Sequence, residues 1–353
     1  MNTEVKLTQY SHGAGCGCKI APNVLEEIIS TSIVMPDNDR LLVGNHSKDD
    51  AAVYDLGNGQ AMISTTDFFM PIVDDPFEFG RIASANAISD VYAMGGKPVL
   101  AIAILGWPIN VLPTEIARKV VEGAQSICLE AGIPLGGGHS IDAPEPIFGL
   151  AVSGLVDVVN LKTNNAAQDG DLLYLTKPLG VGILTTAEKK GILKEEHKGI
   201  AARQMMQLNN IGQKLGAVTG VHAMTDVTGF GLLGHLTEMA EGSGLLAEIN
   251  FDIIPHIIPE LEFYLSLSSL PGGTARNLKA YGHKIDFHKN LDGERARSIL
   301  ADPQTSGGLL IAVQPSCQNE VEELLANHGL GRFVHPIGRM VGEAGDGIFI
   351  KVN

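Results

Sequence analysis

The sequence has few cysteines and a shortage of basic residues. Four cysteines occur among 353 residues, at positions 16, 18, 128 and 317, which are too few and too scattered for a disulfide framework. Lysine and arginine total 25 against 40 aspartates and glutamates, so the formal net charge is −15. A chain this acidic is unsuited to general nucleic-acid binding, which requires basic surface that displaces counterions. We therefore expect any polyanion to be bound through cations.

Long hydrophobic runs are also absent. The longest covers residues 99–105, between Pro98 and Gly106, whereas a membrane-spanning helix requires about 20 apolar residues. The first six residues contain no apolar stretch of the kind found in signal peptides. We expect no membrane partner and a location in the reducing cytoplasm, where cysteines remain free.

The chain has enough apolar material for folded cores. Hydrophobic residues make up 44% of the sequence and charged residues 18%, which excludes disorder over most of the length. The length suggests about two domains. A mixed α/β unit is predicted over residues 21–160, and a second unit of strands and helices over 170–353, after the polar stretch 160–170.

Hydrophobic periodicity predicts the elements of both units. The predicted strands are 51–54, 61–65, 99–105, 147–156, 171–176, 245–250, 308–313 and 347–352. The predicted helices are 77–94, 113–131, 184–190, 201–215 and 231–240, with a further helix beginning near Pro22. That helix carries Val24, Leu25, Ile28, Ile29 and Ile33 on one face.

Residues 1–20 end in a glycine-rich segment that carries two thiols and an amine. Residues 11–19 contain Cys16, Cys18, Lys19 and three glycines without helix or strand periodicity, which predicts a flexible loop. Lys19 favours the thiolate of Cys16 and would lower its pKa. The Cys-x-Cys spacing is compatible with a metal site, a redox pair, a nucleophile or two incidental exposed cysteines. It is tighter than the usual spacing of zinc ligands.

Several aspartates follow apolar residues at the expected edges of cores. Asp49 and Asp50 precede a predicted strand, Asp67 closes another, Asp90 lies on a predicted helix and Asp226 follows the run Ala-Met-Thr. Carboxylates that meet in one place repel each other unless cations lie between them, and Mg²⁺ prefers a few carboxylates together with phosphate oxygens. Each aspartate taken alone is equally compatible with a turn cap.

Glycine clusters give a weaker signal for phosphate binding. Residues 135–140 read Leu-Gly-Gly-Gly-His-Ser, and glycines allow backbone N–H groups to approach a phosphate. A tight turn explains them equally well. Residues 302–308, Asp-Pro-Gln-Thr-Ser-Gly-Gly, most simply turn the chain into a strand. Neither a P-loop nor a dinucleotide-binding motif occurs.

Seven motifs together closely resemble those of the selenophosphate synthetase (selenide, water dikinase) family, over nearly the whole chain. They are GAGCGCK (13–19), DDAAV (49–53), STTDFF (64–69), NAISD (86–90), GGHS (137–140), TDVTGFG (225–231) and DPQTSGG (302–308). Some members of this family carry selenocysteine at the position of Cys16. The resemblance implies a fold similar to aminoimidazole ribonucleotide synthetase, with an α/β domain followed by an α+β domain. It also implies that the N-terminal sheet pairs across a homodimer into a β-barrel.

The resemblance implies the reaction ATP + selenide + water → selenophosphate + AMP + phosphate, with Mg²⁺ and usually K⁺. The product supplies selenium for selenocysteine and selenouridine. The implied catalytic residues are Cys16 and Lys19, and the implied Mg²⁺ ligands are Asp50, Asp67, Asp90 and Asp226. The implied ATP-binding residues are Lys19, Ser47, Lys48, Asp49, Asp67, Asp90 and, from the partner subunit, Gly138, His139 and Ser140. The implied partners are ATP, selenide, a second copy of the chain and a selenium-delivery protein.

Residues 11–19 are interpreted as a lid that closes over an easily oxidised selenium species. Two other functions remain open from the residues. Thiamine monophosphate kinase and hydrogenase maturation dehydratase have related folds with similar aspartates, but the Cys-Gly-Cys-Lys segment disfavours them. A selenium or metal carrier that uses Cys16 and Cys18 would bind stoichiometrically without nucleotide turnover.

Overall fold

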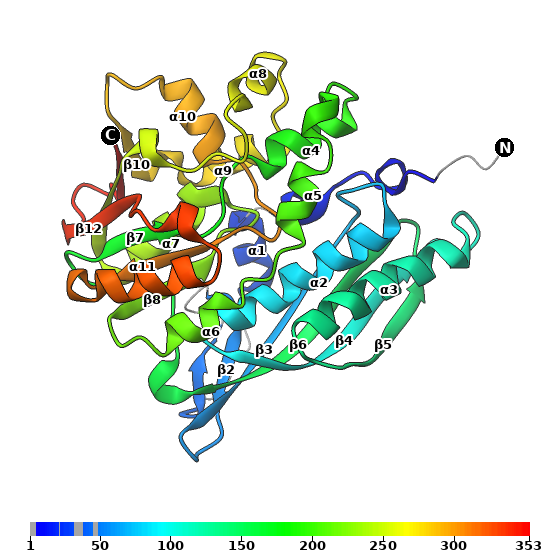
Figure 1. Cartoon of the computed structure of the whole chain (residues 1–353), viewed down its shortest axis with the longest axis horizontal. Coiled ribbons are helices and arrows are strands. Elements are labelled where there is room, and N and C mark those ends of the chain that lie inside the picture. The colour runs from blue at the N-terminus through cyan, green and yellow to red at the C-terminus, as the bar shows by residue number, and fades with distance from the viewer. Residues whose placement is uncertain (1–4, 21, 32–37, 45–48) are drawn as a thin grey trace.

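The computed structural model describes the chain apart from residues 1–4, 21, 32–37 and 45–48, and apart from the side chains of residues 18, 22, 23 and 26. Two sheets lie side by side, each with its own helices (Figure 1). The first sheet contains β1 (Leu41–Val43), β2 (Ala52–Asp55), β3 (Gln60–Phe69), β4 (Lys97–Trp107), β5 (Leu135–Asp142) and β6 (Ile147–Asp157). Their order is β1-β2-β3-β6-β4-β5.

One face of this sheet is covered by α2 (Pro76–Ala93), and α3 (Thr114–Glu130) packs beside α2 (Figure 1). Asp75 caps α2 by accepting a hydrogen bond from the Glu78 N–H, and Pro76 occupies the first turn, where its missing N–H costs nothing. Alternate residues of β3 point toward α2, so Asp67 lies on the covered face and Phe68 on the opposite face.

The opposite face of the first sheet is exposed and apolar. Phe68, Ile102 and Ile141 are 50%, 45% and 60% exposed. Strand pairing aligns Phe68 with Gly149, then with Ile104 and His139 across β6, β4 and β5. His139 therefore belongs to this open face, at the edge strand of the sheet. A contiguous apolar surface of this kind usually marks an interface.

The second sheet lies in the C-terminal half. It contains β7 (Leu172–Leu175), β8 (Val221–Asp226), β9 (Leu245–Ile249), β10 (Ile285–Phe287), β11 (Leu309–Val313), β12 (Gly338–Glu343) and β13 (Ile350–Val352). The order is β10-β13-β9-β12-β7-β11-β8. The associated helices are α4 (Val181–Lys189), α5 (Ile200–Met205), α6 (Ile211–Gly216), α7 (Gly231–Ser243), α8 (Leu261–Ser266), α9 (Gly272–Tyr281), α10 (Gly293–Leu300) and α11 (Gln318–Asn327).

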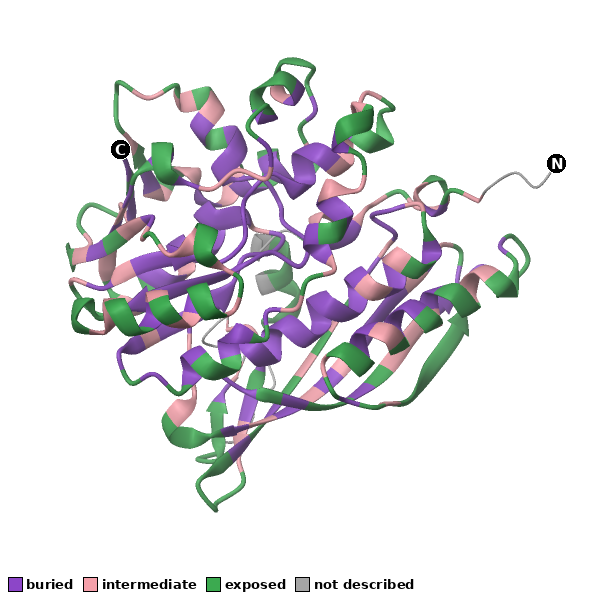
Figure 2. Ribbon diagram, viewed as in Figure 1, coloured by how far each residue is buried: buried purple, intermediate pink, exposed green. Residues whose placement is uncertain are grey.

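Helix α2 joins the two halves. It contacts β3 and β6 of the first sheet, and also β8, α5 and α6 of the C-terminal half. Nearly all of its residues are buried, as Figure 2 shows. Among the described residues, no helix is both long and apolar enough to cross a membrane.

Four expectations about elements need correction. Asp67 does not close its strand, because β3 continues to Phe69. Residues 135–140 are not a turn but part of edge strand β5, where a Cβ at Gly138 would meet the Ala103 carbonyl oxygen at 2.3 Å. The predicted helix 201–215 is two helices, α5 and α6, because the Asn209 side chain between them donates to Ser89 Oγ and the Gly307 carbonyl. The last strand, β13, begins at Ile350 rather than at residue 347.

The sequence patterns also left several elements unpredicted. The strands β1, β8, β10 and β12 and the helices α8–α11 were not expected. Residues 1–20, expected to lack regular structure, contain two turns of 3₁₀ helix, η1 (Leu7–Tyr10) and η2 (Gly15–Cys18). The helix expected near Pro22 is present as α1 (Pro22–Ile29), and Ile33 lies outside the described residues.

Candidate active site

A cavity of about 580 Å³ between the two halves brings together six of the twelve predicted site residues. We call it the acidic pocket. Its walls include Lys19, Asp49, Asp50, Asp67, Asp90 and Asp226. Asp50 precedes β2, Asp67 lies on β3, Asp90 on α2 and Asp226 at the end of β8. Residues far apart in the sequence thus converge on one space.

Other predicted residues are not among the described walls of this pocket. Ser47 and Lys48 lie outside the described residues. Gly138, His139 and Ser140 belong to exposed edge strand β5 and do not line the pocket.

Hydroxyl and amide side chains hold three of the carboxylates in place. Thr225 Oγ1 donates to Asp50 Oδ1 at 2.9 Å, Thr65 Oγ1 donates to Asp90 Oδ2 and Asn86 Nδ2 donates to Asp67 Oδ2. The second oxygens of Asp50 and Asp226 are buried without a hydrogen-bond partner among the described residues. Buried carboxylate oxygens are normally paired, so these two oxygens are suited to a cation.

Burial and mutual repulsion disfavour the charged forms of these acids. The pKa of Asp50 is raised well above its usual value by burial and then by Asp226, Asp49 and Asp90. Burial, followed by Asp226 and Asp67, likewise raises the pKa of Asp90. For Asp226, burial raises the pKa to about 6, although Ser89 and Lys19 oppose the change. A bound cation would remove this repulsion.

The donor set fits Mg²⁺ that is shared with a phosphate ligand. Within the described part of the chain, no three carboxylate, imidazole or thiol groups are close enough together to hold one ion by themselves. Mg²⁺ is usually bound by one or two carboxylates, with water and substrate phosphates completing its octahedron. Carboxylates spread over several walls, two of them with an unpaired oxygen, match that arrangement.

Lys19 supplies the positive charge on the wall of the pocket. Asp67 is the main cause of a raised pKa at this amine, with Cys16, Asp90 and Asp226 contributing and burial opposing. The side chain keeps accessible surface within the cavity, and its Nζ lies 6.0 Å from the centre of the Phe230 ring. Lys19 is therefore positively charged and able to meet an anion.

Cys16 is buried rather than exposed. It lies in η2 and is 1% exposed. Its backbone N–H donates to Thr305 Oγ1 at 3.0 Å, and its Sγ lies 3.2 Å from Asn86 Oδ1, which also accepts from the Ser306 N–H at 2.7 Å. The alternative of an incidental exposed cysteine is wrong for Cys16. The side chain of Cys18 lies outside the described set.

Three supporting residues were missed by sequence reasoning. Asn86 bridges the Cys16 thiol and Asp67, Thr305 accepts a hydrogen bond from the Cys16 N–H, and the Ser306 N–H donates to Asn86. All three lie in the motifs 86–90 and 302–308. The motifs indicated these segments. The pairing of individual side chains depends on contacts between distant parts of the chain, which the sequence does not show.

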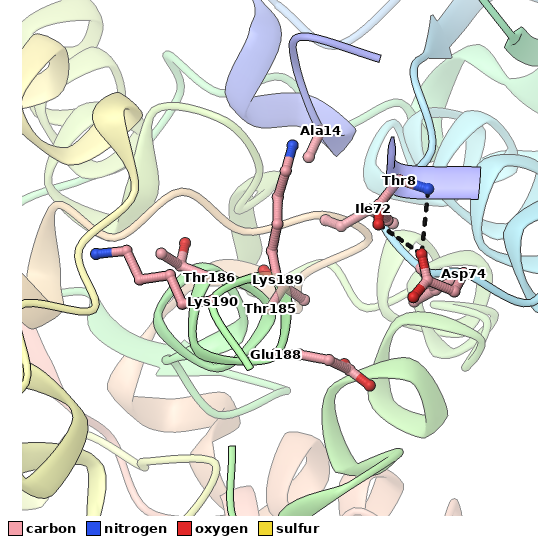
Figure 3. Close-up of a pocket in the computed structure, with 10 residues that line it drawn as sticks. Thr8, Ala14, Ile72, Asp74, Thr185, Thr186, Glu188, Lys189 and Lys190 are labelled. Carbon is pink, nitrogen blue, oxygen red and sulfur yellow. Dashed lines mark hydrogen bonds between the residues drawn. The ribbon is translucent and has the colours of Figure 1, made fainter. Parts of the chain in front are cut away.

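A second hollow, of about 310 Å³, lies where the N-terminal segment meets α4. Thr8 donates from its backbone N–H and its hydroxyl to Asp74 Oδ1, and Lys189 extends toward Ala14 (Figure 3). Glu188 points away from both lysines of its wall (Figure 3). The described walls of this hollow carry two carboxylates, Asp74 and Glu188, and its contacts anchor the N-terminal segment.

Family models of AIR synthase related proteins match both halves of the chain. The N-terminal domain model matches residues 48–156 and the C-terminal domain model matches residues 168–351. Among solved structures, thiamine-monophosphate kinase from Stenotrophomonas maltophilia is 19% identical with a TM-score of 0.63, covering 90% of this chain and 92% of its own. The hydrogenase maturation protein HypE in complex with ATP is 19% identical with a TM-score of 0.61, covering 95% and 89%. At these identities the similarity establishes the fold alone.

Sequence relatives are much closer. The selenide, water dikinase of Aeromonas hydrophila is 59% identical over 350 residues, covering 99% of each chain. That of Photorhabdus laumondii is 58% identical over 353 residues, covering all of both chains. An Escherichia coli selenide, water dikinase is 56% identical over 351 residues, covering 99% and 98%. With identity this high over its whole length and acidic walls around one cavity, the chain belongs to the selenide, water dikinase family.

Proposed function

We propose that the acidic pocket is where this chain makes selenophosphate from selenide and ATP, releasing AMP and phosphate. The observation that carries this proposal is the convergence of five aspartates and Lys19 on one cavity beside the buried turn of Cys16. Phosphoryl transfer depends mainly on positioning and charge neutralisation, and this cavity offers both.

The aspartates hold the polyphosphate through Mg²⁺. Asp50, Asp67, Asp90 and Asp226 would hold Mg²⁺, which would supply positive charge to the phosphates and to the leaving group. Asn86, Thr65 and Thr225 keep three of these carboxylates oriented. Asp49 accepts hydrogen bonds from the N–H groups of Asp50 and Asn164, which fixes the segment that leads into β2.

Cys16 and Lys19 act on the selenium side of the reaction. Lys19 carries its positive charge on the pocket wall, where it would meet the transferring phosphate or the selenium anion. Cys16 lies three residues away, and its turn is fastened by Thr305 and Asn86. Opening and closing of residues 11–19 as a lid is part of the proposal.

A homodimer completes the site. The exposed apolar face of the first sheet supports it, and His139 belongs to that face. Pairing of two such faces would bury Phe68 and Ile102 and bring Gly138, His139 and Ser140 of one copy toward the nucleotide of the other. In analytical ultracentrifugation, Ile102→Glu should shift the protein from dimer to monomer, and a wild-type monomer would contradict this assignment.

Two further components rest on family membership alone. They are a K⁺ requirement and a protein that delivers selenium. Replacing K⁺ by Na⁺ in the assay below should lower turnover, and unchanged turnover would remove K⁺ from the proposal.

Anaerobic nucleotide analysis tests the function. Purified protein with Mg²⁺·ATP should form AMP and phosphate when selenide is added and little AMP without it. ADP as the final product would favour an ordinary kinase. Stoichiometric selenium binding without nucleotide turnover would favour a carrier.

A further inference from the structure

A small cavity lies between η2 and α9, separate from the acidic pocket. Its volume is about 10 Å³, and its walls include Cys16, Lys19, Phe230, Arg276 and Asn277. Lys19 and Phe230 line both this cavity and the acidic pocket. The two spaces therefore meet at the proposed catalytic amine.

The charge of this cavity is opposite to that of its neighbour. Lys19 and Arg276 are its charged wall residues, and no described aspartate or glutamate lines it. In the acidic pocket, five aspartates and Glu238 would repel an approaching anion. An anion that must reach Cys16 therefore meets a lower electrostatic barrier from the α9 side.

Arg276 also fastens the Cys16 turn. It projects from α9 and donates from Nη2 to the carbonyl oxygen of Gly17. Asn277, the next residue, is buried and donates to the carbonyls of Gly229 and Ala301 at 2.9 and 3.0 Å. The middle turn of α9, which presents Arg276, is thus tied to the segment that carries Phe230.

Two glycines in the wall of this cavity allow neighbouring segments to approach closely. A Cβ at Gly229 would lie 2.6 Å from the Cys16 carbonyl oxygen, and one at Gly273 would lie 2.5 Å from Pro303 Cγ. A cavity of roughly 10–15 Å³ on this measure accommodates one water-sized particle. Hydrogen selenide is larger than water but has a single heavy atom, so it needs far less additional room here than a tetrahedral oxyanion would.

We propose that this cavity is the entry site of the selenide anion and that Arg276 is its second cationic residue beside Lys19. The inference rests on the proposed function. Selenide enters from the α9 side, ATP and Mg²⁺ occupy the acidic pocket, and the two substrates meet at Lys19. Cys16 lines the cavity, and its Sγ lies 3.2 Å from Asn86 Oδ1, so the anion binds beside the thiol.

Steady-state kinetics of Arg276→Gln tests the assignment. Under anaerobic conditions we expect the KM for selenide to rise about tenfold, as loss of one charge-assisted contact predicts, while the KM for ATP changes less than about twofold. Arg276→Lys should recover most of the selenide affinity because it keeps the charge. Lys279→Gln removes an exposed positive charge one turn along α9 and should leave both KM values unchanged.

Alkylation of Cys16 gives a readout independent of turnover. Sulfide, a chalcogenide of the same charge, should protect Cys16 of the wild type from a neutral alkylating reagent that is in large excess over sulfide and reaches the buried thiol when residues 11–19 open. Arg276→Gln should need about tenfold more sulfide for the same protection. An unchanged selenide KM together with unchanged sulfide protection would overturn the entry site. If the wild type forms no selenide-dependent AMP, the proposed function itself fails, and sulfide protection still decides whether the cavity binds the anion.

Discussion

Two buried carboxylates of the C-terminal half, Asp226 and Asp302, differ in their surroundings more than in their burial. Both are almost fully enclosed, and each has one oxygen without a partner among the described residues. Asp226 faces other aspartates and Lys19 across the acidic pocket. Asp302 accepts from the Gly182 N–H at 3.0 Å and from Gln304 Nε2 at 2.8 Å. Burial alone therefore does not distinguish a candidate metal ligand, whereas convergence with other carboxylates on a cavity does.

The largest difference in activity between a catalytic and a structural residue should appear when the two cysteines Cys16 and Cys317 are replaced. Cys16→Ser should abolish selenide-dependent AMP formation, because a hydroxyl is a much weaker nucleophile and soft-atom ligand than a thiolate. Binding of a Mg²⁺·ATP analogue should persist, since Cys16 does not line the acidic pocket. The partly exposed Cys317 is the matched control, and Cys317→Ser should keep wild-type turnover. Wild-type AMP formation by Cys16→Ser would remove Cys16 from the mechanism.

The two aspartates themselves give the next largest effect. Asp226→Asn should weaken Mg²⁺-dependent binding of an ATP analogue by at least about tenfold, the loss typical even of residues that only support a metal ligand. Asp302→Asn keeps the shape of a residue outside the pocket, so the affinity should stay within about twofold of wild type. Titration calorimetry of both variants measures the contrast. Equal affinities would show that Asp226 is not a ligand.

Asp302 should in turn control the pH dependence of stability. Burial raises the pKa of Asp302 to about 8, well above its usual value of 3.8. The folded state then retains a proton that the unfolded chain releases, so this group makes the protein less stable as pH rises from about 4 to about 8. Asp302→Asn should remove that component, with a melting shift of about 2–4 °C for each kcal/mol.

Melting curves at pH 5.5 and 8.5 for both proteins measure this component. The wild type should lose more stability between these pH values than Asp302→Asn does. Equal losses would mean that Asp302 ionises normally despite its burial.

Replacing Asn86, which contacts both Asp67 and Cys16, should have a smaller effect, on the reactivity of the Cys16 thiol. Asn86→Asp keeps the shape but loses the amide donor to Asp67 and places a carboxylate beside the Cys16 thiol. Negative charge disfavours the thiolate, so alkylation of Cys16 at pH 7 should slow severalfold. A rate equal to that of wild type would show that the contact with Asn86 does not influence the thiol.

Much of the fold could be predicted from the sequence where periodicity is strong. Helices α2 and α3 and strands β3, β4 and β6 were expected, because long apolar patterns determine them. Strand β5 was not expected, because its three glycines favour a turn when the local sequence is considered alone. They form a strand because β5 pairs with β4. The break between α5 and α6 depends on Asn209 bonding to residues more than ninety positions away. Local patterns contain no such information.

Like the fold, the acidic pocket could be predicted only in part from the sequence. Positions next to apolar runs indicated Asp50, Asp90 and Asp226 as candidates, and their convergence could be stated only once β8 and α2 were in place. The burial of Cys16 was not predicted, because a glycine-rich segment reads as exposed. Its contacts with Thr305 and Asn86 join positions 289 and 70 residues apart. Arg276 carried no sequence signal.

The metal dependence of nucleotide binding tests the central claim most directly. Titration calorimetry of the wild type with a non-hydrolysable ATP analogue should show tight binding with Mg²⁺ and loss of most affinity with EDTA, because the acidic pocket repels a bare triphosphate. Binding of equal strength in EDTA would contradict the account, since aspartates without a cation cannot hold a polyanion.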